Sequence, residues 1–164
     1  MENITFDEAN EADIPALVSL LTLLFGIEKD FSVDVSKQKT GLELLLKNPQ
    51  TATIQVARNS ANKAIGMVSA QLVISTAQGA QSAWVEDMVI DRAYRGQGIG
   101  KQLLQNALDW AKNQGATRAQ LLVNRRAILS RLEVETASNS FHLSMSPSSV
   151  LTGGIWSVLH GYDL

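Results

Sequence analysis

The residues with the clearest chemical meaning are those of the glycine loop, Arg95-Gly96-Gln97-Gly98-Ile99-Gly100-Lys101, which lies between a predicted strand and a predicted helix. The first turn of a helix leaves backbone N–H groups without acceptors, and the aligned peptide dipoles make this end positive. Glycines let the main chain curve closely around an anion, because no Cβ blocks its approach. The loop therefore predicts a pyrophosphate site formed mainly by backbone amides.

Two other phosphate-binding motifs do not fit this loop. A P-loop needs a glycine where Arg95 stands and a hydroxyl residue where Gln102 stands. A dinucleotide fingerprint needs its third glycine at the position of Lys101. The structural alternative is a glycine-rich turn that only starts a helix, and three glycines within five residues make this alternative the less favoured one.

The elements that position the loop follow from the spacing of the apolar residues. Strands are predicted at residues 4–6, 51–58, 64–76, 82–91 and 119–124, and helices at residues 10–26, 36–47 and 98–114. The three middle strands have short connections, which predicts an antiparallel meander, and the strand–helix–strand unit after them predicts a parallel pair. The fold class is therefore α/β, with a mixed, mostly antiparallel central sheet and flanking helices.

Composition narrows the class of protein. The chain has 164 residues, of which 45% are hydrophobic and 18% charged, which suits a single domain over residues 1–164. The absence of cysteine excludes disulfides and thiol chemistry, and a net charge of −2 gives no reason to expect a nucleic acid partner. The longest apolar stretch, residues 17–27, is shorter than the ~20 residues that span a membrane, and the acidic start does not resemble a secretion signal. We expect a cytoplasmic protein with no membrane partner.

The run from Met88 to Gly100, MVIDRAYRGQGIG, closely resembles motif A of the GNAT superfamily of N-acetyltransferases. The resemblance covers about residues 3–124 and implies the fold of that family and the use of acetyl-CoA without a metal. It implies that amides of the glycine loop from Arg95 to Gly100, with Lys101 following, hold the pyrophosphate, and that the two strands flanking the motif-A helix splay apart around the acetyl group. Main-chain groups of Met88, Val89 and Ile90 would pair with the pantetheine arm. Asn124 would contact the cofactor, or would simply cap the next element.

Acetyl transfer to an amine needs a proton acceptor and a donor to the thioester carbonyl oxygen. Glu86 is the candidate base, since many relatives have an acidic residue in this region, and regular alternation would place it on one face with Trp84, Met88 and Ile90. The alternative is that Glu86 is a solvated or salt-bridged strand residue. The amide of Met88 or Val89 is the candidate oxyanion donor.

The usual acid of the family is absent by position. The family pattern N-x-x-A-x-x-F-Y begins correctly at Asn124 and Ala127, but Ser130 and Arg131 stand at its Phe-Tyr positions. Residues 125–164 form a divergent, serine-rich tail in which Tyr162 is a substitute acid only if the tail folds back. One hypothesis is an altered reading frame near residue 126, which reading the other two frames would test. A catalytically impaired acyl-CoA-binding or sensor protein is therefore the alternative function.

The acceptor is predicted from the acidic residues after the first helix, Glu28, Asp30 and Asp34, because this region commonly borders the acceptor pocket in the family. An acidic rim favours a cationic amine of a small molecule or a peptide. Solvated surface carboxylates are the plain alternative. Dimers are common in the family, so a homodimer is a further expectation, and a general nucleotide-binding module is a third functional class.

Overall fold

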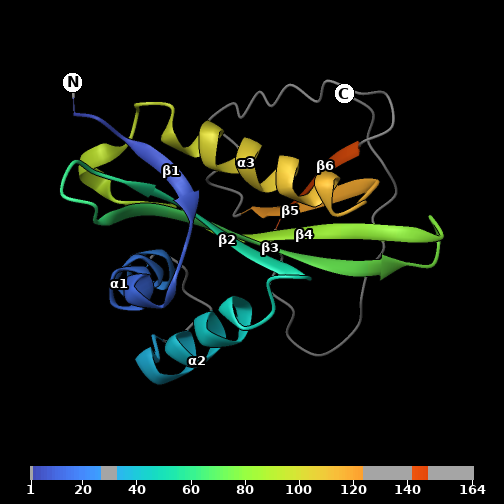
Figure 1. Cartoon of the computed structure of the whole chain (residues 1–164), viewed down its shortest axis with the longest axis horizontal. Coiled ribbons are helices and arrows are strands. Elements are labelled where there is room, and N and C mark those ends of the chain that lie inside the picture. The colour runs from blue at the N-terminus through green and yellow to red at the C-terminus, as the bar shows by residue number, and fades with distance from the viewer. Residues whose placement is uncertain (1, 27–32, 124–141, 148–164) are drawn as a thin grey trace.

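The computed structural model describes residues 2–26, 33–123 and 142–147. The described strands form one six-stranded sheet in the order β1-β2-β3-β4-β5-β6 (Figure 1). The elements, in chain order, are β1 (Thr5–Glu8), the 3₁₀ turn η1 (Glu11–Asp13), α1 (Ile14–Phe25), α2 (Val35–Leu46), β2 (Ala52–Arg58), β3 (Ala64–Ser75), β4 (Ala80–Ile90), the 3₁₀ turn η2 (Arg92–Tyr94), α3 (Ile99–Asn113), β5 (Arg118–Val123) and β6 (His142–Pro147).

The topology confirms the predicted α/β class. β1 to β4 pair antiparallel in succession, and β4 pairs parallel with β5 across the α3 crossover. The sequence did not predict β6, which pairs parallel with β5 from Arg118 opposite His142 to Val123 opposite Pro147. A signal was present, because Leu143 and Met145 alternate with serines at the period of a strand.

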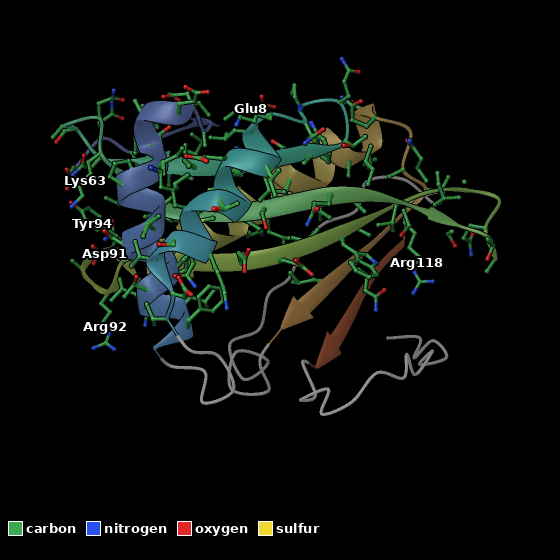
Figure 2. All side chains as sticks on the ribbon, turned by 90° about the horizontal axis from the view of Figure 1, so that it is seen from below. Glu8, Lys63, Asp91, Arg92, Tyr94 and Arg118 are labelled. Carbon is green, nitrogen blue, oxygen red and sulfur yellow. The ribbon has the colours of Figure 1, made fainter. Side chains whose placement is uncertain are left out.

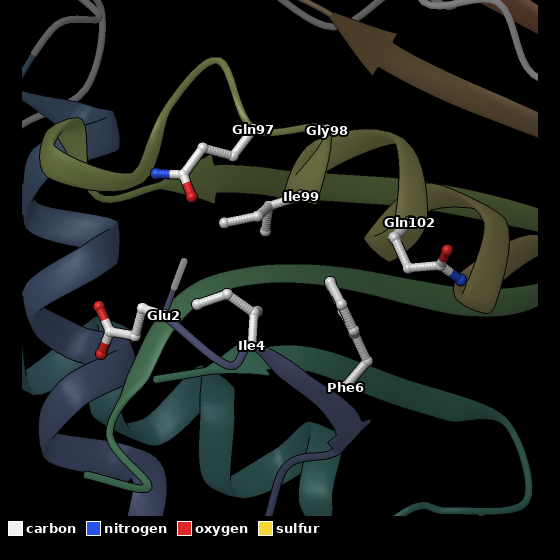
Figure 3. A pocket seen from close by; sticks show the side chains of 7 residues that line it. All are labelled: Glu2, Ile4, Phe6, Gln97, Gly98, Ile99 and Gln102. Atoms are coloured by element: carbon white, nitrogen blue, oxygen red, sulfur yellow. The ribbon is translucent and has the colours of Figure 1, made fainter. Parts of the chain in front are cut away.

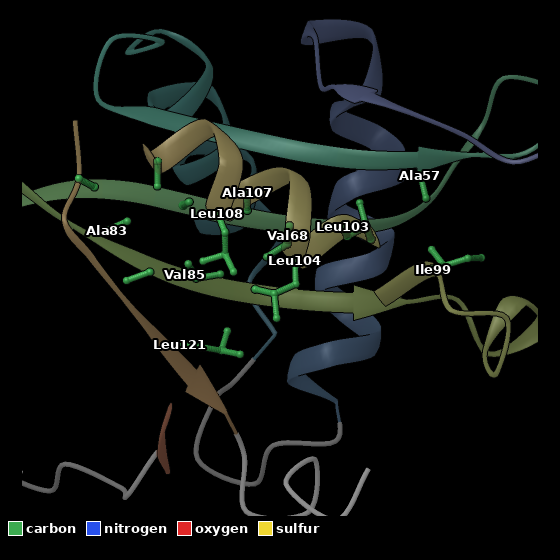
Figure 4. Close-up of a cluster of buried hydrophobic side chains, with 14 of the residues drawn as sticks. Ala57, Val68, Ala83, Val85, Ile99, Leu103, Leu104, Ala107, Leu108 and Leu121 are labelled. Atoms are coloured by element: carbon green, nitrogen blue, oxygen red, sulfur yellow. The ribbon is translucent and has the colours of Figure 1, made fainter. Parts of the chain in front are cut away.

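The helices cover both faces of the sheet, with α3 on one face and α1 and α2 on the other (Figure 1). The α3 face is closed by a stripe at three- and four-residue spacing, which matches the period of a helix with one buried side. These α3 residues pack against Val68, Val85 and Leu121 of the sheet (Figure 4). The stripe consists of Ile99, Leu103, Leu104, Ala107, Leu108 and Ala111.

The opposite face is closed by the leucines of α1 and α2. Leu17 and Leu21 of α1 and Leu42 of α2 are buried with Val56 and Met67 of the sheet. Asn10 begins the α1 region with a capping box, in which Ala12 N–H donates to its side chain and Asp13 accepts from its backbone N–H. Within the described parts of the chain, none of the helices is long and apolar enough to cross a membrane.

An ion-pair network centred on the buried Arg58 joins β1, η1 and β2. The guanidinium of Arg58, which is 4% exposed, donates from Nη2 to Asp13 Oδ2 at 2.8 Å and from Nε to Asp7 Oδ1 at 2.8 Å. Its Nη1 also donates to Asp13 Oδ1. The hydrogen bonds from Arg58 hold the pKa of Asp13 below its ordinary value against the opposing effect of burial, and the same bonds raise the pKa of Arg58. The network fixes where α1 enters the fold.

Replacing Arg58 by methionine leaves Asp13 as a buried charge without its cation, so we expect the free energy of unfolding at pH 7 to fall by about 3–5 kcal/mol in urea denaturation. The control is Lys39→Ala, which breaks an exposed pair between Lys39 and Glu43 at 3.8 Å. That control should cost at most about 0.5 kcal/mol. Equal effects of the two substitutions would contradict a stabilising role for the network.

The effect of Arg58→Met should depend on pH in a defined direction. Because the folded-state pKa of Asp13 is lowered, its ionised form contributes stability above the unfolded pKa of about 3.9, and this contribution is lost as pH falls through the lower folded value. The difference in unfolding free energy between wild type and Arg58→Met should therefore narrow below pH ~4. A difference that widens there would show that Asp13 is not the group responsible.

Candidate functional site

A bulge interrupts β4 at Asp87. The β3–β4 register pairs Ser69 with Glu86 and Met67 with Val89, so Val68 lies opposite two residues of β4. Asp87 has a φ of +52°, in the left-handed region that Asp tolerates better than most residues. The hydroxyl of Ser69, in β3, donates toward Glu86 O at 3.2 Å and Asp87 Oδ2 at 3.4 Å. We call this feature the β4 bulge.

The β4 bulge changes which face each following side chain takes. Val85, before the bulge, is buried on the α3 face, so alternation directs Glu86 to the α1–α2 face. After the bulge, Val89 packs with the α1–α2 cluster, while Met88 and Ile90 pack on the α3 face. The expectation that Glu86 shares a face with Met88 and Ile90 is therefore wrong, because regular alternation does not continue through an inserted residue.

No other described strand pairs with residues 86–90 of β4 on the side away from β3, and we call this side the open edge. Pairing between β4 and β5 ends at Val85 opposite Leu121, although β5 continues to Val123. The rest of β5 pairs with β6, and both strands turn away from β4 (Figure 2). The splaying expected from the family resemblance is therefore present among the described strands.

Main-chain groups of Met88 and Ile90 face this open edge. Asp91 N–H donates to Ile65 O at 2.8 Å, which makes Asp91 and Ile65 a hydrogen-bonded pair of the antiparallel ladder. Such pairs alternate, so the N–H and C=O of Val89 face β3, and those of its two neighbours face the other way. Val89 was expected to offer its main chain to a ligand, and the ladder assigns this role to Met88 and Ile90 instead.

Glu86 is the titratable side chain at the start of the open edge. It is partly buried on β4, and desolvation by burial raises its pKa above the ordinary value for a glutamate. A carboxylate that is costly to ionise holds a proton more readily than a solvated one. The raised pKa makes Glu86 a stronger base than a solvated glutamate, which is the direction that a proton acceptor needs.

The glycine loop follows directly from the end of β4. The side chain of Asp91 accepts a hydrogen bond from Ala93 N–H at 3.1 Å and so caps η2. Asp91, Arg92 and Tyr94 lie at one end of the molecule (Figure 2). Arg95 then folds back, and its Nε donates to Ile90 O at 3.0 Å. The amide of Arg95, expected to bind phosphate, instead lies 3.5 Å from Arg92 O, which it uses as its acceptor.

The remaining loop amides are arranged as an anion site requires. Gly96 and Gly98 have φ values of +77° and +76°, which only glycine adopts without strain. Hydrogen bonding in α3 begins with Gln102 N–H donating to Gly98 O at 3.2 Å, so the amides of residues 99–101 precede the first helical bond. The backbone from Gly96 to Gly98 is exposed rather than packed against protein.

A hollow of about 590 Å³ opens beside the loop (Figure 3). Phe6 of β1 and Ile4, just before that strand, form its apolar side, and Ile99 points into it from the first turn of α3. Polar side chains surround these three residues. They are Glu2, Gln97 and Gln102. None of the residues that line the hollow belongs to the open edge of β4. The hollow therefore borders the glycine loop on the side of β1 and lies apart from Glu86.

Gly100 ties the start of α3 to β4. A Cβ built on Gly100 would lie 2.9 Å from Met88 Cε and 3.0 Å from Ile90 Cδ1. The side chains that the β4 bulge turns toward α3 are therefore those that need this glycine. The bulge and the first turn of the helix form one packed unit.

Several predicted site residues cannot be placed in this geometry. Asn124, Glu28 and Asp30 lie outside the described residues, as do the divergent positions of the tail. Asp34, the third acidic residue considered for the acceptor rim, caps α2 by accepting from Ser36 and Lys37 N–H. Among the described residues, no group of three His, Cys, Asp or Glu side chains could hold a metal ion.

Sequence reasoning missed Ser69 and the conformation of Asp87. Ser69 is 1% exposed and stands between Val68 and Ala70, where a sequence pattern shows only a small strand residue. Asp87 carries a weak signal, since Asp is enriched at positive φ, but the same residue type is common in ordinary turns. Ser69 and Asp87 come into contact because of the register shift between β3 and β4, which the sequence of neither strand reveals alone.

Comparison with protein families gives a match to the acetyltransferase (GNAT) family over residues 18–129. The match ends close to the position where the sequence departs from the family pattern. A comparison with curated protein sequences gives no significant match.

Solved structures with a similar fold include acetyltransferases of several organisms. Glucosamine-6-phosphate N-acetyltransferase from Arabidopsis thaliana is 17% identical, with a TM-score of 0.65 over 84% of this chain and 98% of that one. A predicted acetyltransferase with acetyl-CoA from Clostridium acetobutylicum is also 17% identical, with a TM-score of 0.66 over 84% and 93% of the two chains. A transcriptional regulator from Bacillus halodurans is 25% identical, with a TM-score of 0.66 over 84% and 96%.

The close approach of α3 to β4 predicts opposite effects for two glycine-to-alanine substitutions. Gly41, in the middle of α2, has nothing within 4 Å of a built Cβ, so Gly41→Ala should stabilise by about 0.5–1 kcal/mol through helix propensity. Gly100→Ala should destabilise by about 1 kcal/mol or more, because Met88 and Ile90 must move. Urea denaturation measures both, and equal stabilisation by the two would contradict the packed contact.

Proposed function

Because the chain belongs to the acetyltransferase (GNAT) family, we propose that it binds acetyl-CoA along the open edge of β4 and the glycine loop, and transfers the acetyl group to a primary amine. The observation that carries this proposal is that the features needed for binding and reaction follow one another along the chain. One run of chain supplies a desolvated carboxyl at Glu86, a strand edge with which no other described strand pairs, and the amides before the first bond of α3. These features suit a reacting group, a pantetheine arm and a pyrophosphate, in that order along the chain.

The described residues fit acetyl-CoA in two respects. The amides of residues 96–101 lie at the positive end of α3, where glycine torsions hold the main chain open to a diphosphate. Met88 and Ile90 present main-chain groups at the open edge of β4, as an added strand would need. Ile90 O can accept from Arg95 and from a ligand together, because a carbonyl oxygen has two lone pairs. The acetyltransferase from Clostridium acetobutylicum, described with acetyl-CoA, supports the same assignment.

We assign the chemistry to Glu86 and Met88. The amine nitrogen forms a bond to the acetyl carbon, the thioester C–S bond breaks, and coenzyme A leaves as a thiolate. Glu86 accepts the proton that the amine loses, directly or through a water molecule. The N–H of Met88, at the open edge, donates to the carbonyl oxygen as negative charge develops on it. The thiolate is itself a tolerable leaving group, and Tyr162, the substitute acid suggested by the sequence, lies outside the described residues.

The acceptor is proposed to be a cationic amine of a small molecule or a peptide. Its support is the acidic composition around Glu28 and Asp30, and the name of the Arabidopsis neighbour, an N-acetyltransferase of an amino-sugar phosphate. The α1–α2 face, to which Glu86 is directed, is the side from which such an amine would approach.

A second function is favoured by one observation, the presence of Ser130 and Arg131 where the family pattern has Phe-Tyr. A protein that retains the glycine loop but has lost its acid would bind acetyl-CoA without turning it over. The two functions differ in the release of free coenzyme A when acetyl-CoA is mixed with a panel of amines. Release above the uncatalysed rate supports the enzyme, and binding without release supports the impaired protein.

Acetyl-CoA at a hundredfold excess over its Kd should raise the melting temperature by about 5–10 °C, since such binding contributes about 2.7 kcal/mol. Gly98→Asp places a negative charge beside the proposed diphosphate and should abolish this shift. The control is Gly79→Asp, in the β3–β4 turn, because Gly79 has a similar φ of +60° and nothing within 4 Å of its built Cβ. A larger shift with ATP or NAD than with acetyl-CoA would overturn the proposal in favour of a general nucleotide-binding module.

Glu86→Gln should lower kcat by about 10²–10⁴-fold and leave the acetyl-CoA shift intact, because only the proton acceptor is removed. Wild-type kcat should rise as pH increases through the raised pKa of Glu86 and should be lost below it. The surface substitution Glu43→Gln serves as the control. A Glu86→Gln enzyme that keeps the wild-type kcat and pH profile would remove Glu86 from the mechanism.

The same substitution should increase stability at neutral pH. A carboxyl whose folded pKa is raised favours the folded state below its unfolded pKa, and this contribution is lost as pH rises through the folded value. The side chain introduced by Glu86→Gln stays neutral at every pH, so the melting temperature of this variant should exceed that of wild type at pH 7. The difference should shrink toward pH 4, and thermal melts at the two pH values measure it.

A further inference from the structure

We propose that Ser69 is a positioning residue for acetyl transfer. Its hydroxyl stabilises the β4 bulge, which directs the side chains of Glu86 and Met88 to opposite faces of the sheet. The proposal rests on the function proposed above, and Ser69 itself touches neither substrate. Its role would be to act through two consecutive residues of the neighbouring strand.

The first observation is the environment of the Ser69 hydroxyl. Ser69 is 1% exposed, in a stretch of β3 whose neighbours Val68 and Ala70 are fully buried. A buried hydroxyl costs free energy unless it is hydrogen-bonded, and an apolar residue would suit a strand core better. The hydroxyl lies 3.2 Å from Glu86 O and 3.4 Å from Asp87 Oδ2. It therefore spans the peptide at which the strand changes its register.

The second observation is that the β4 bulge is intrinsically unfavourable. The φ of Asp87, +52°, lies in the left-handed region, which an L-residue adopts only at a cost in free energy. Without the inserted residue, strict alternation would place Glu86, Met88 and Ile90 on one face. Either Met88 and Ile90 would then leave Gly100 of α3, or Glu86 would turn into the α3 core. The two arrangements of β4 place Glu86 and Met88 differently, and the proposed chemistry needs both. An interaction that stabilises the bulge therefore also stabilises the geometry of the proposed site.

The third observation is that the binding part of the site has separate anchors. Asp91 N–H donates to Ile65 O at 2.8 Å, and Arg95 Nε donates to Ile90 O at 3.0 Å. Neither bond involves Ser69, so the glycine loop should keep its shape when the hydroxyl is removed. Loss of Ser69 should consequently impair the reaction step while acetyl-CoA binding survives. A displacement of about 1 Å at a reacting group costs up to about 100-fold in rate.

The test compares Ser69→Ala with Ser82→Ala. Ser82 is a matched control, because it is 6% exposed and its hydroxyl donates to a backbone carbonyl, Arg118 O, across a strand pair at 3.4 Å. It lies on the paired half of β4, away from the bulge. We expect Ser69→Ala to lower kcat by about 10- to 100-fold with an unchanged acetyl-CoA melting shift, and Ser82→Ala to leave both unchanged. Both should lose similar stability.

A second variant distinguishes positioning from general destabilisation. Glycine adopts a φ of +52° without strain, so Asp87→Gly in the Ser69→Ala background should recover part of the lost kcat by keeping the bulge without its hydrogen bond. A Ser69→Ala protein with the same kcat as Ser82→Ala would overturn the proposal. The proposal would also be overturned if Ser69→Ala lost kcat and the melting-temperature shift with acetyl-CoA to the same extent, because Ser69 would then have only a structural role.

A measurement that needs no turnover separates this proposal from the proposed function. Amide hydrogen exchange at residues 86–88, followed by NMR, should be faster in Ser69→Ala than in wild type and unchanged in Ser82→Ala. If wild type releases no coenzyme A with any amine, the enzymatic function fails, and with it the catalytic reason for Ser69. If amide exchange at residues 86–88 were the same in Ser69→Ala as in wild type, Ser69 would not stabilise the bulge, whatever the activity of the protein.

Discussion

One inserted residue in β4 is the constraint on which the candidate site depends. A strand alternates its side chains strictly between two faces, so a single unpaired residue reverses every position after it. Before Asp87, the strand sends Val85 to the α3 face and Glu86 to the α1–α2 face, and after it Met88 and Ile90 return to α3. Without this reversal, a charged residue and two apolar residues would compete for the same face.

The reversal coincides with the end of pairing between β4 and β5 at Val85 and Leu121. β4 stays paired to β3 on its other side, so pairing with β3 holds the main chain of residues 86–90 in place where no other described strand pairs with it. The helix that follows packs onto the same side chains through Gly100, which ties the positive end of α3 to the strand edge. The glycine loop and the strand edge are therefore joined by packing at Gly100, whereas the ion-pair network of Arg58 lies on the α1 side.

The likeness to solved acetyltransferases at 17% identity shows that this fold is specified by a pattern of burial more than by particular residues. A stripe of leucines and alanines on α3 and a second cluster under α1 and α2 suffice to bury both faces of the sheet. The proposed chemistry would depend on a few polar groups, namely Glu86 and the backbone of the loop, and the family's usual tyrosine is missing from its position in the sequence.

The sequence by itself determined the order of helices and strands from β1 to β5, the parallel β4–α3–β5 crossover and the glycine loop before α3, because each leaves a local trace in apolar period or glycine spacing. It also predicted Glu86 as the candidate base, which stays a prediction, and it missed β6, whose alternation is hidden among serines. Tertiary structure alone decided which face Glu86 and Met88 take, which main-chain groups line the open edge, and that Ser69 meets Asp87. These depend on the register between two strands, and register is set by pairing partners rather than by the local sequence of either strand.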